Sequence, residues 1–184
     1  MSSQTHSPTG ADADADWLNP LNIMASDGAW ATRSLPPVQT SGRLNPGVFG
    51  FSIPSDATID GVIARVEHHQ TTGYLIVDTV ALVTTGAVES PNHASESLSV
   101  PIGADGFSFY GSETDLWFGS LTPADVNAPG FGLAVKYHNA DGVATDEVFV
   151  DAFQLTVYYT PAGGGSGVNA RSMSWLMIDE EFAP

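Results

Sequence analysis

Cysteine is absent from this 184-residue sequence. The chain therefore forms no disulfide, supplies no thiolate ligand to a metal and has no cysteine nucleophile for catalysis. A disulfide framework is the usual sequence sign of an oxidising compartment. Without cysteines, the sequence leaves the redox compartment open.

Basic residues are scarce. Five lysines and arginines stand against 21 aspartates and glutamates, so the formal net charge is −16, and Lys136 is the only lysine. Nucleic acids and anionic membranes are bound mainly through Lys and Arg, so the composition argues against both as partners. The acidity is typical of a solubilising surface, or of adaptation to a salty medium that screens self-repulsion.

Long apolar runs are also missing. No segment approaches the ~20 apolar residues that a helix needs to cross a bilayer. Residues 1–16 are rich in Ser, Thr, Ala and Asp and lack the apolar centre of a signal peptide. We therefore expect no membrane span and no secretion signal. The 19 glycines and 12 prolines favour many turns over long helices.

The sequence has a series of strand patterns instead. Apolar residues alternate with period two from Val48 to Ile53, from Ile59 to His69 and from Asp146 to Thr160. After a short turn that follows His69, Tyr74 to Val83 returns as another apolar strand. Residues 59–69 and 74–83 are therefore predicted to form an antiparallel hairpin.

A single short helical turn is predicted near residues 122–127. Thr122 is a good N-cap, Pro123 suits the first helical position, and Asp125 can meet the free N–H groups of the first turn. Turn signals recur elsewhere, including Leu44-Asn45-Pro46, where Asn-Pro favours a chain reversal. With roughly seven to nine short strands, the predicted fold class is all-β, an antiparallel β-sandwich of jelly-roll or Ig-like type.

Composition divides the chain into four parts. Residues 1–16 form an acidic N-terminal arm that we expect to be flexible, residues 17–160 the β-sandwich domain, and residues 161–167 (PAGGGSG) a flexible linker. Residues 168–184 follow as a hydrophobic C-terminal tail, whose large apolar side chains need a docking surface. We expect these to contact a neighbouring subunit: Met173, Trp175, Leu176, Met177, Ile178 and Phe182.

No catalytic or cofactor signature is present. His68 and His69 are adjacent, and neighbours on a strand point to opposite faces, so they cannot bind one metal ion together. Asp78 and Asp151 each interrupt an apolar strand face, for which buried hydrogen bonds to loop amides are a simpler explanation than catalysis. We expect a protein that is not an enzyme, with no cofactor and no metal site.

Aromatic side chains leave a binding function open. Trp17, Trp30, Tyr110 and Trp117 could form a platform that stacks on sugar rings, although aromatic residues in a β-sandwich more often belong to the core. The alternative interpretation is therefore a carbohydrate-binding module that recognises a host-surface glycan.

Several motifs in a fixed order point to one group of proteins. They are residues 17–28 (WxNPxNIxASDG), 49–54 (FGFSIP), 57–61 (ATIxG), 115–117 (DLW), 121–127 (LTPADVN) and 150–160 (VDxxxLTVYYT). With these motifs the chain resembles a β-sandwich module that recurs in structural proteins of tailed bacteriophages and prophages, mostly without assigned function. The resemblance covers about residues 17–160, so the acidic arm and the apolar tail lie outside it.

The resemblance implies a virion component and identifies no functional residue. It favours a structural protein that stabilises the particle through inter-subunit contacts, first a capsid decoration (cement) protein and next a collar or tail component. The expected partners are other virion proteins, either the major capsid protein or neck and tail subunits, and further copies of the chain in a homo-oligomer.

Overall fold

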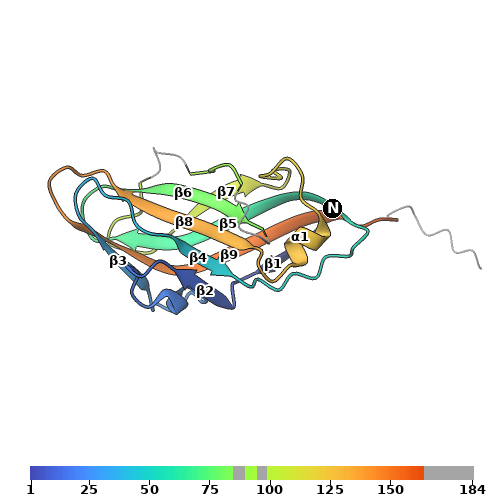
Figure 1. Cartoon of the computed structure of the whole chain (residues 1–184), viewed down its shortest axis with the longest axis horizontal. Helices are drawn as coiled ribbons and strands as arrows, with labels where there is room; N and C mark the ends of the chain where they lie inside the picture. Colours follow the sequence, from blue (N-terminus) through green and yellow to red (C-terminus); the bar gives the residue numbers. More distant parts are fainter. Residues whose placement is uncertain (85–89, 95–98, 164–184) are drawn as a thin grey trace, which may run out of the picture.

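The computed structural model describes residues 1–84, 90–94 and 99–163. These residues form two antiparallel sheets packed face to face (Figure 1), which confirms the predicted β-sandwich. In the five-stranded sheet the order is β1 (Ser2–His6), β9 (Asp146–Thr160), β5 (Thr58–Gln70) and β7 (Gly106–Ser112), and β3 (Ala31–Leu35) also pairs with β9. In the four-stranded sheet the order is β2 (Gly10–Ala13), β4 (Leu44–Gly47), β8 (Gly132–Asn139) and β6 (Leu75–Val83). A 3-10 turn, η1 (Pro20–Ile23), and helix α1 (Pro123–Asn127) complete the described elements.

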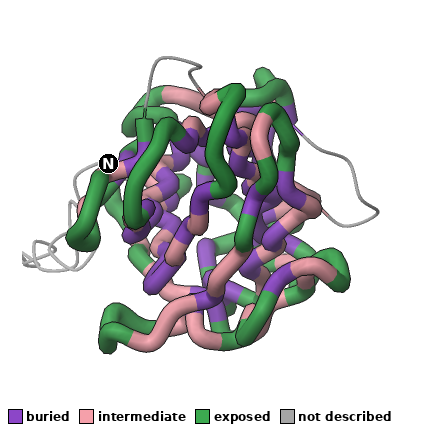
Figure 2. Tube along the Cα trace, turned by 90° about the vertical axis from the view of Figure 1, so that its left-hand side faces the viewer, coloured by how far each residue is buried: buried purple, intermediate pink, exposed green. Residues whose placement is uncertain are grey.

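The hydrophobic core lies between the two sheets. Alternate residues of a strand point to opposite faces, so the long strands β5, β8 and β9 each direct an apolar face inward. Figure 2 shows the buried positions gathered inside the molecule and the exposed ones along its outer turns. Large side chains that are fully buried come from both sheets: Leu35, Leu82, Leu133, Tyr137, Phe153 and Leu155.

The predicted hairpin between residues 59–69 and 74–83 is wrong, although both strands exist. β5 pairs with β9 and β7, whereas β6 pairs with β8 in the other sheet. The chain between them crosses from one sheet to the other, and the Gln70 side chain spans the crossing by accepting the Leu75 N–H at 2.8 Å. A period of two indicates which residues face the core, but it does not indicate which strand lies alongside.

The N-terminal residues lie in strands, where the sequence predicted a flexible arm. β1 pairs with the C-terminal part of β9, and β2 pairs with β4. Gln4 also exchanges two hydrogen bonds with the Ser52 backbone. Pairing at the edge of a sheet is held by backbone hydrogen bonds, which require no apolar side chain. The polar composition of residues 1–16 therefore gave no sign of it.

Val48 to Ile53, predicted as a strand, belongs to no sheet in the described part of the chain. Phe49 and Phe51 are buried, as the alternation indicates. Positive φ angles at Val48 (55°) and Gly50 (69°) interrupt the extended backbone, however. The segment is a buried connection between β4 and β5 rather than a strand.

The local predictions elsewhere have mixed outcomes. Helix α1 is confirmed together with its cap, since Thr122 and Asp125 form a reciprocal capping box and Pro123 is the first helical residue. The chain reversal expected at Leu44-Asn45-Pro46 is wrong, because these residues belong to β4 and pair with β2. Pro46 has no N–H to donate, and β4 pairs with β8 at Leu44 and Gly47, on either side of Asn45 and Pro46.

Candidate functional site

His68 lies in the core. Its Nδ1 is 2.9 Å from the Tyr137 hydroxyl of β8, and its Nε2 is 2.9 Å from the Ser108 hydroxyl of β7. Burial lowers the pKa of His68 from 6.5 to about 4 and raises the pKa of Tyr137 well above 10. A serine beside a histidine can act as a nucleophile and base, but this pair is buried between the sheets. The cluster is a neutral hydrogen-bonded link between the two sheets.

His69 points the opposite way, to the outer face of the five-stranded sheet. It stacks on Phe149 with ring centroids 4.6 Å apart, meets the edge of Trp30, and places Nδ1 2.7 Å from Asp105 Oδ1. The Trp30 Nε1–H donates to the same Asp105 carboxylate at 3.3 Å. The predicted separation of His68 from His69 is confirmed, and the outer cluster holds the segment before β7 against the sheet.

The two carboxylates singled out from the sequence have local partners. Asp151 is 2% exposed and accepts hydrogen bonds from the backbone N–H groups of Asp27 (3.4 Å) and Gly28 (3.2 Å), as the structural explanation predicted. Asp78 lies at a bulge in β6 and accepts a hydrogen bond from the Thr79 hydroxyl at 2.8 Å. Asp151 lies on β9 of the five-stranded sheet and Asp78 on β6 of the four-stranded sheet.

The aromatic platform considered from the sequence does not form. Trp17, Tyr110 and Trp117 are core residues, with the Trp117 Nε1–H donating to the Val62 carbonyl at 2.9 Å. Trp30 is half-buried in the cluster with His69. Core packing, the more frequent role of such residues, applies to three of the four.

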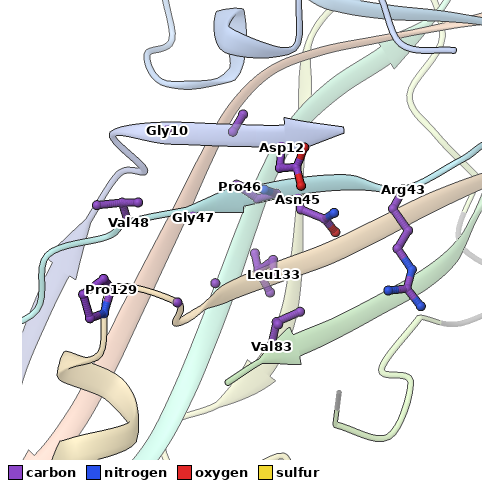
Figure 3. Close-up of a pocket in the computed structure, with 13 residues that line it drawn as sticks. Gly10, Asp12, Arg43, Asn45, Pro46, Gly47, Val48, Val83, Pro129 and Leu133 are labelled. Atoms are coloured by element: carbon purple, nitrogen blue, oxygen red, sulfur yellow. The ribbon is translucent and has the colours of Figure 1, made fainter. Parts of the chain in front are cut away.

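A groove of about 480 Å3 opens on the outer face of the four-stranded sheet. Residues of β2, β4 and β8 line it, together with Arg43, Val48, Val83, Pro129 and Gly130. Figure 3 shows Asp12, Asn45, Leu133 and Val83 following one another across β2, β4, β8 and β6. We call this feature the glycine groove, because four glycines line it and the three that belong to strands are paired side by side: Gly10 with Gly47, and Gly47 with Gly132.

The glycine groove is mainly apolar. Asp12, Arg43 and Asn45 are its polar side chains, and no lining residue is aromatic. The Asn45 Oδ1 is buried without a hydrogen-bond partner among the described residues. The described groups with clearly shifted pKa values, His68, Tyr110 and Tyr137, lie in the core and not in the groove. The arrangement suits apolar groups that bring a hydrogen-bond donor, and it lacks the paired titratable groups of a hydrolytic site.

Sequence reasoning missed the glycine groove. The available signal was an isolated glycine in each of three strand segments, which marks a close backbone approach or a missing side chain. The strands β2 and β4 were not predicted from the sequence, and the pairing that brings the three glycines together is non-local. The signal could therefore not be assembled from the sequence.

The predicted contact residues Met173, Trp175, Leu176, Met177, Ile178 and Phe182 lie outside the described residues, as does the linker from residue 164 onward. In the described part of the chain, no three His, Asp or Glu side chains gather where they could hold a metal ion. No helix within the described ranges is long and apolar enough to cross a membrane.

No protein-family model matches the sequence, and no curated protein matches it. Solved structures do align with it. A structure titled "CBM4 structure and function" is 11% identical, with 83% of this chain and 92% of that chain covered and a TM-score of 0.41. A chain of infectious bursal disease virus (Gx strain) is 9% identical, covering 89% of this chain and 33% of that one, with a TM-score of 0.44. TmCBM61 in complex with β-1,4-galactotriose is 14% identical. The alignment covers 83% of this chain and 86% of that chain, with a TM-score of 0.40.

Proposed function

We propose that this chain is a non-enzymatic structural protein of a tailed-phage particle. We place the role of a capsid decoration protein first, and that of a collar or tail component second. In this role the sandwich sits on the particle surface and the C-terminal tail lies across a neighbouring subunit. The added contact area would help the shell to resist internal pressure.

The observation that carries this proposal is the chemistry of the glycine groove. An active site brings together titratable groups with shifted pKa values, and a sugar site presents aromatic rings or dense hydrogen-bonding groups. The groove has an apolar lining with three polar side chains, and its volume of about 480 Å3 suits several side chains of a protein partner. It therefore favours a protein surface over a substrate.

The remaining reactive residues support the same conclusion. His68 is hydrogen-bonded inside the core, Asp151 holds a loop, and His69 packs in an aromatic cluster with Asp105. Each of these side chains already has a structural partner. A protein whose polar groups serve its own fold is suited to assembly rather than to catalysis.

Partner contact is assigned to the apolar tail, with Met173, Trp175, Leu176, Met177, Ile178 and Phe182 as its contact residues. A surface with a net charge of −16 repels further copies and other acidic proteins unless an apolar contact offsets the repulsion. Burial of large apolar side chains contributes ~25 cal/mol per Å2. A few of these side chains therefore suffice to hold one subunit on another.

Glycan recognition is the second candidate, and one surface feature favours it. Phe107 and Phe109 of β7 are 47% and 62% exposed on one face of an edge strand, with the Arg65 guanidinium 3.7 Å above the Phe107 ring. Exposed rings beside a polar side chain can stack on sugars. A glycan site, if present, would be at β7 and not at the four aromatic residues suggested by the sequence.

One pair of assays separates the two functions. The purified chain is applied to phage shells that lack it and, in parallel, to a glycan array. We expect stoichiometric binding to shells and no signal on the array, with the Phe107→Ser/Phe109→Ser variant binding shells as well as the wild type. Specific glycan binding that this variant loses, together with no binding to shells, would contradict the structural role.

A further inference from the structure

We propose that the glycine groove is the receptor for the C-terminal segment, residues 168–184, of a second copy of this chain. The inference rests on the proposed function in one respect, the assignment of inter-subunit contact to that segment. It adds the surface that receives the segment and identifies the partner as another copy of the same protein.

The three strand glycines of the groove differ in the space around them. A Cβ at Gly132 would collide with the Pro46 carbonyl, so the fold itself requires a glycine there. Gly10 and Gly47 are different: a Cβ at Gly47 would have no described atom within 4 Å, and one at Gly10 would make an ordinary contact 3.7 Å from Val48. Neither is among the glycines with positive φ. Packing and backbone conformation do not explain these two glycines, but an open groove does.

The chemistry of the tail matches that of the groove. Residues 173–178 (MSWLMI) form the most apolar block outside the described residues, and residues 179–181 (DEE) follow it directly. The apolar lining at Val48, Val83 and Pro129 suits the apolar block. The unpartnered Asn45 Oδ1 can accept an N–H from the backbone of a bound segment, which would remove a buried unsatisfied group.

Charge favours the same face. Arg43 borders the groove, and Lys136 of β8 lies on the outer face of the same sheet, since its neighbours Val135 and Tyr137 face the core. The chain has only five basic residues, and two of them are on this side of the molecule. Asp12 is the acidic side chain in the lining. An acidic segment of a second acidic chain meets less repulsion here than it would over the rest of the surface.

The place where the chain leaves the sandwich points to a second copy. β9 belongs to the five-stranded sheet, whereas the groove opens on the outer face of the four-stranded sheet. To fill its own groove, the tail would have to pass from the five-stranded sheet round the edge of the sandwich to the outer face of the four-stranded sheet. A tail from a neighbouring copy meets no such constraint.

The consequence is a directional assembly. A segment of one copy that fills a groove of the next makes a head-to-tail contact, in which the two partners use different surfaces. Such contacts close into rings or continue as open chains, depending on the rotation between neighbours. Rings of subunits around a symmetry axis of a particle can be built from contacts of this kind.

Disulfide cross-linking tests the proposal on the full chain, since the absence of native cysteines removes any background. A tagged Gly47→Cys chain is mixed with an untagged Ser174→Cys chain and oxidised, and the products are separated without reductant. We expect a cross-linked pair containing one tagged and one untagged chain. The matched control is Gly142→Cys, because a Cβ there also has open space and Gly142 follows β8 at the end opposite Gly132.

The outcomes are decisive in either direction. A tagged–untagged pair that forms at least tenfold more with Gly47→Cys than with Gly142→Cys supports the proposal. Equal yields overturn it. The second-copy assignment is also tested with a single chain that carries both Gly47→Cys and Ser174→Cys. If this chain forms only intrachain disulfides, both at high dilution and in mixtures, the assignment is overturned, because the tail then fills its own groove.

A substitution that fills the groove provides an independent reading. Gly47→Glu places a side chain and a negative charge in the groove. We expect the self-association constant, measured by analytical sedimentation, to fall by roughly 30-fold, as for loss of a hot-spot contact. Gly142→Glu adds the same charge elsewhere and should leave self-association unchanged; equal effects of the two variants would overturn the proposal.

The groove assignment and the virion role can fail separately. If Gly47→Glu still self-associates normally while tail deletion abolishes binding to phage shells, the groove assignment fails and the virion role stands. If the wild type self-associates through the groove but does not bind shells, the groove assignment stands and the virion role fails.

Discussion

His68 shows how this fold uses a titratable residue for structure. Both of its ring nitrogens have hydroxyl partners, Tyr137 on one sheet and Ser108 on the other, and it is fully buried. Burial is the main cause of its lowered pKa, with a smaller opposing effect from the Asp105 carboxylate and a further lowering by His69. The ring is therefore neutral in the folded protein and holds the two sheets together.

This burial predicts a pH-dependent stability. In the unfolded chain His68 takes up a proton near pH 6.5, whereas in the fold it does so only near 4. The contribution of His68 to the free energy of unfolding is therefore complete above pH 6.5. It is lost as the pH falls toward 4, and the loss is about 3 kcal/mol at most. Denaturant unfolding of the wild type and of His68→Gln across this range measures it. The acidic residues affect both proteins alike, so the wild type should lose more stability than the variant; parallel curves would contradict the assignment.

Gly111 provides a second residue-scale prediction. Its φ is +80°, and a Cβ there would collide with the Val62 carbonyl and the Trp117 indole. We expect Gly111→Ala to lower the free energy of unfolding by about 2 kcal/mol or more, because strain and a steric collision act together. Gly142→Ala, in open space, is the control and should change stability by less than about 0.5 kcal/mol in the same denaturation experiment.

At the scale of elements, helix α1 is the clearest case of a local signal that decides a local structure. The Asp125 N–H donates to the Thr122 hydroxyl oxygen at 3.2 Å, and the Thr122 N–H donates to the Asp125 carboxylate at 3.0 Å. A helix of this length depends on its cap, since it has few internal hydrogen bonds.

Removing the cap should therefore be measurable. Thr122→Ala is expected to cost about 1 kcal/mol of unfolding free energy, and Thr122→Ser, which keeps the hydroxyl, only a fraction of that. Thermal or denaturant unfolding of the two variants tests the difference. Equal stability of the alanine and serine variants would mean that the hydroxyl does not hold the turn.

The same scale shows what the sequence could predict and what it could not. The long strands β5 and β9 and the capped turn follow from local patterns, which the fold preserves. The pairing of β5 with β9 rather than with β6 depends on contacts across the chain, which no local pattern encodes. β1 and β2 were missed because backbone pairing at an edge needs no apolar side chain. The glycine groove depends on both of these non-local features, so only the three-dimensional arrangement brings its glycines together.

At the scale of the whole molecule, the chain combines a strongly acidic composition with two apolar features. One is the glycine groove on the four-stranded sheet, and the other is the block of residues 173–178. Net repulsion keeps such a protein soluble and separate until a specific apolar contact forms. The proposed assembly follows from this combination, since screening by salt weakens the repulsion but leaves the apolar contact in place.

The most direct test of this account is the number of copies incorporated per particle. Particles are assembled with the wild type, with a chain truncated after Gly167, and with a variant in which Asp179, Glu180 and Glu181 become Asn, Gln and Gln. We predict full occupancy for the wild type and none for the truncated chain. The amide variant retains the apolar block and should keep most of the occupancy. Wild-type occupancy of the truncated chain would contradict the central claim that the apolar C-terminal segment attaches this protein to its neighbours.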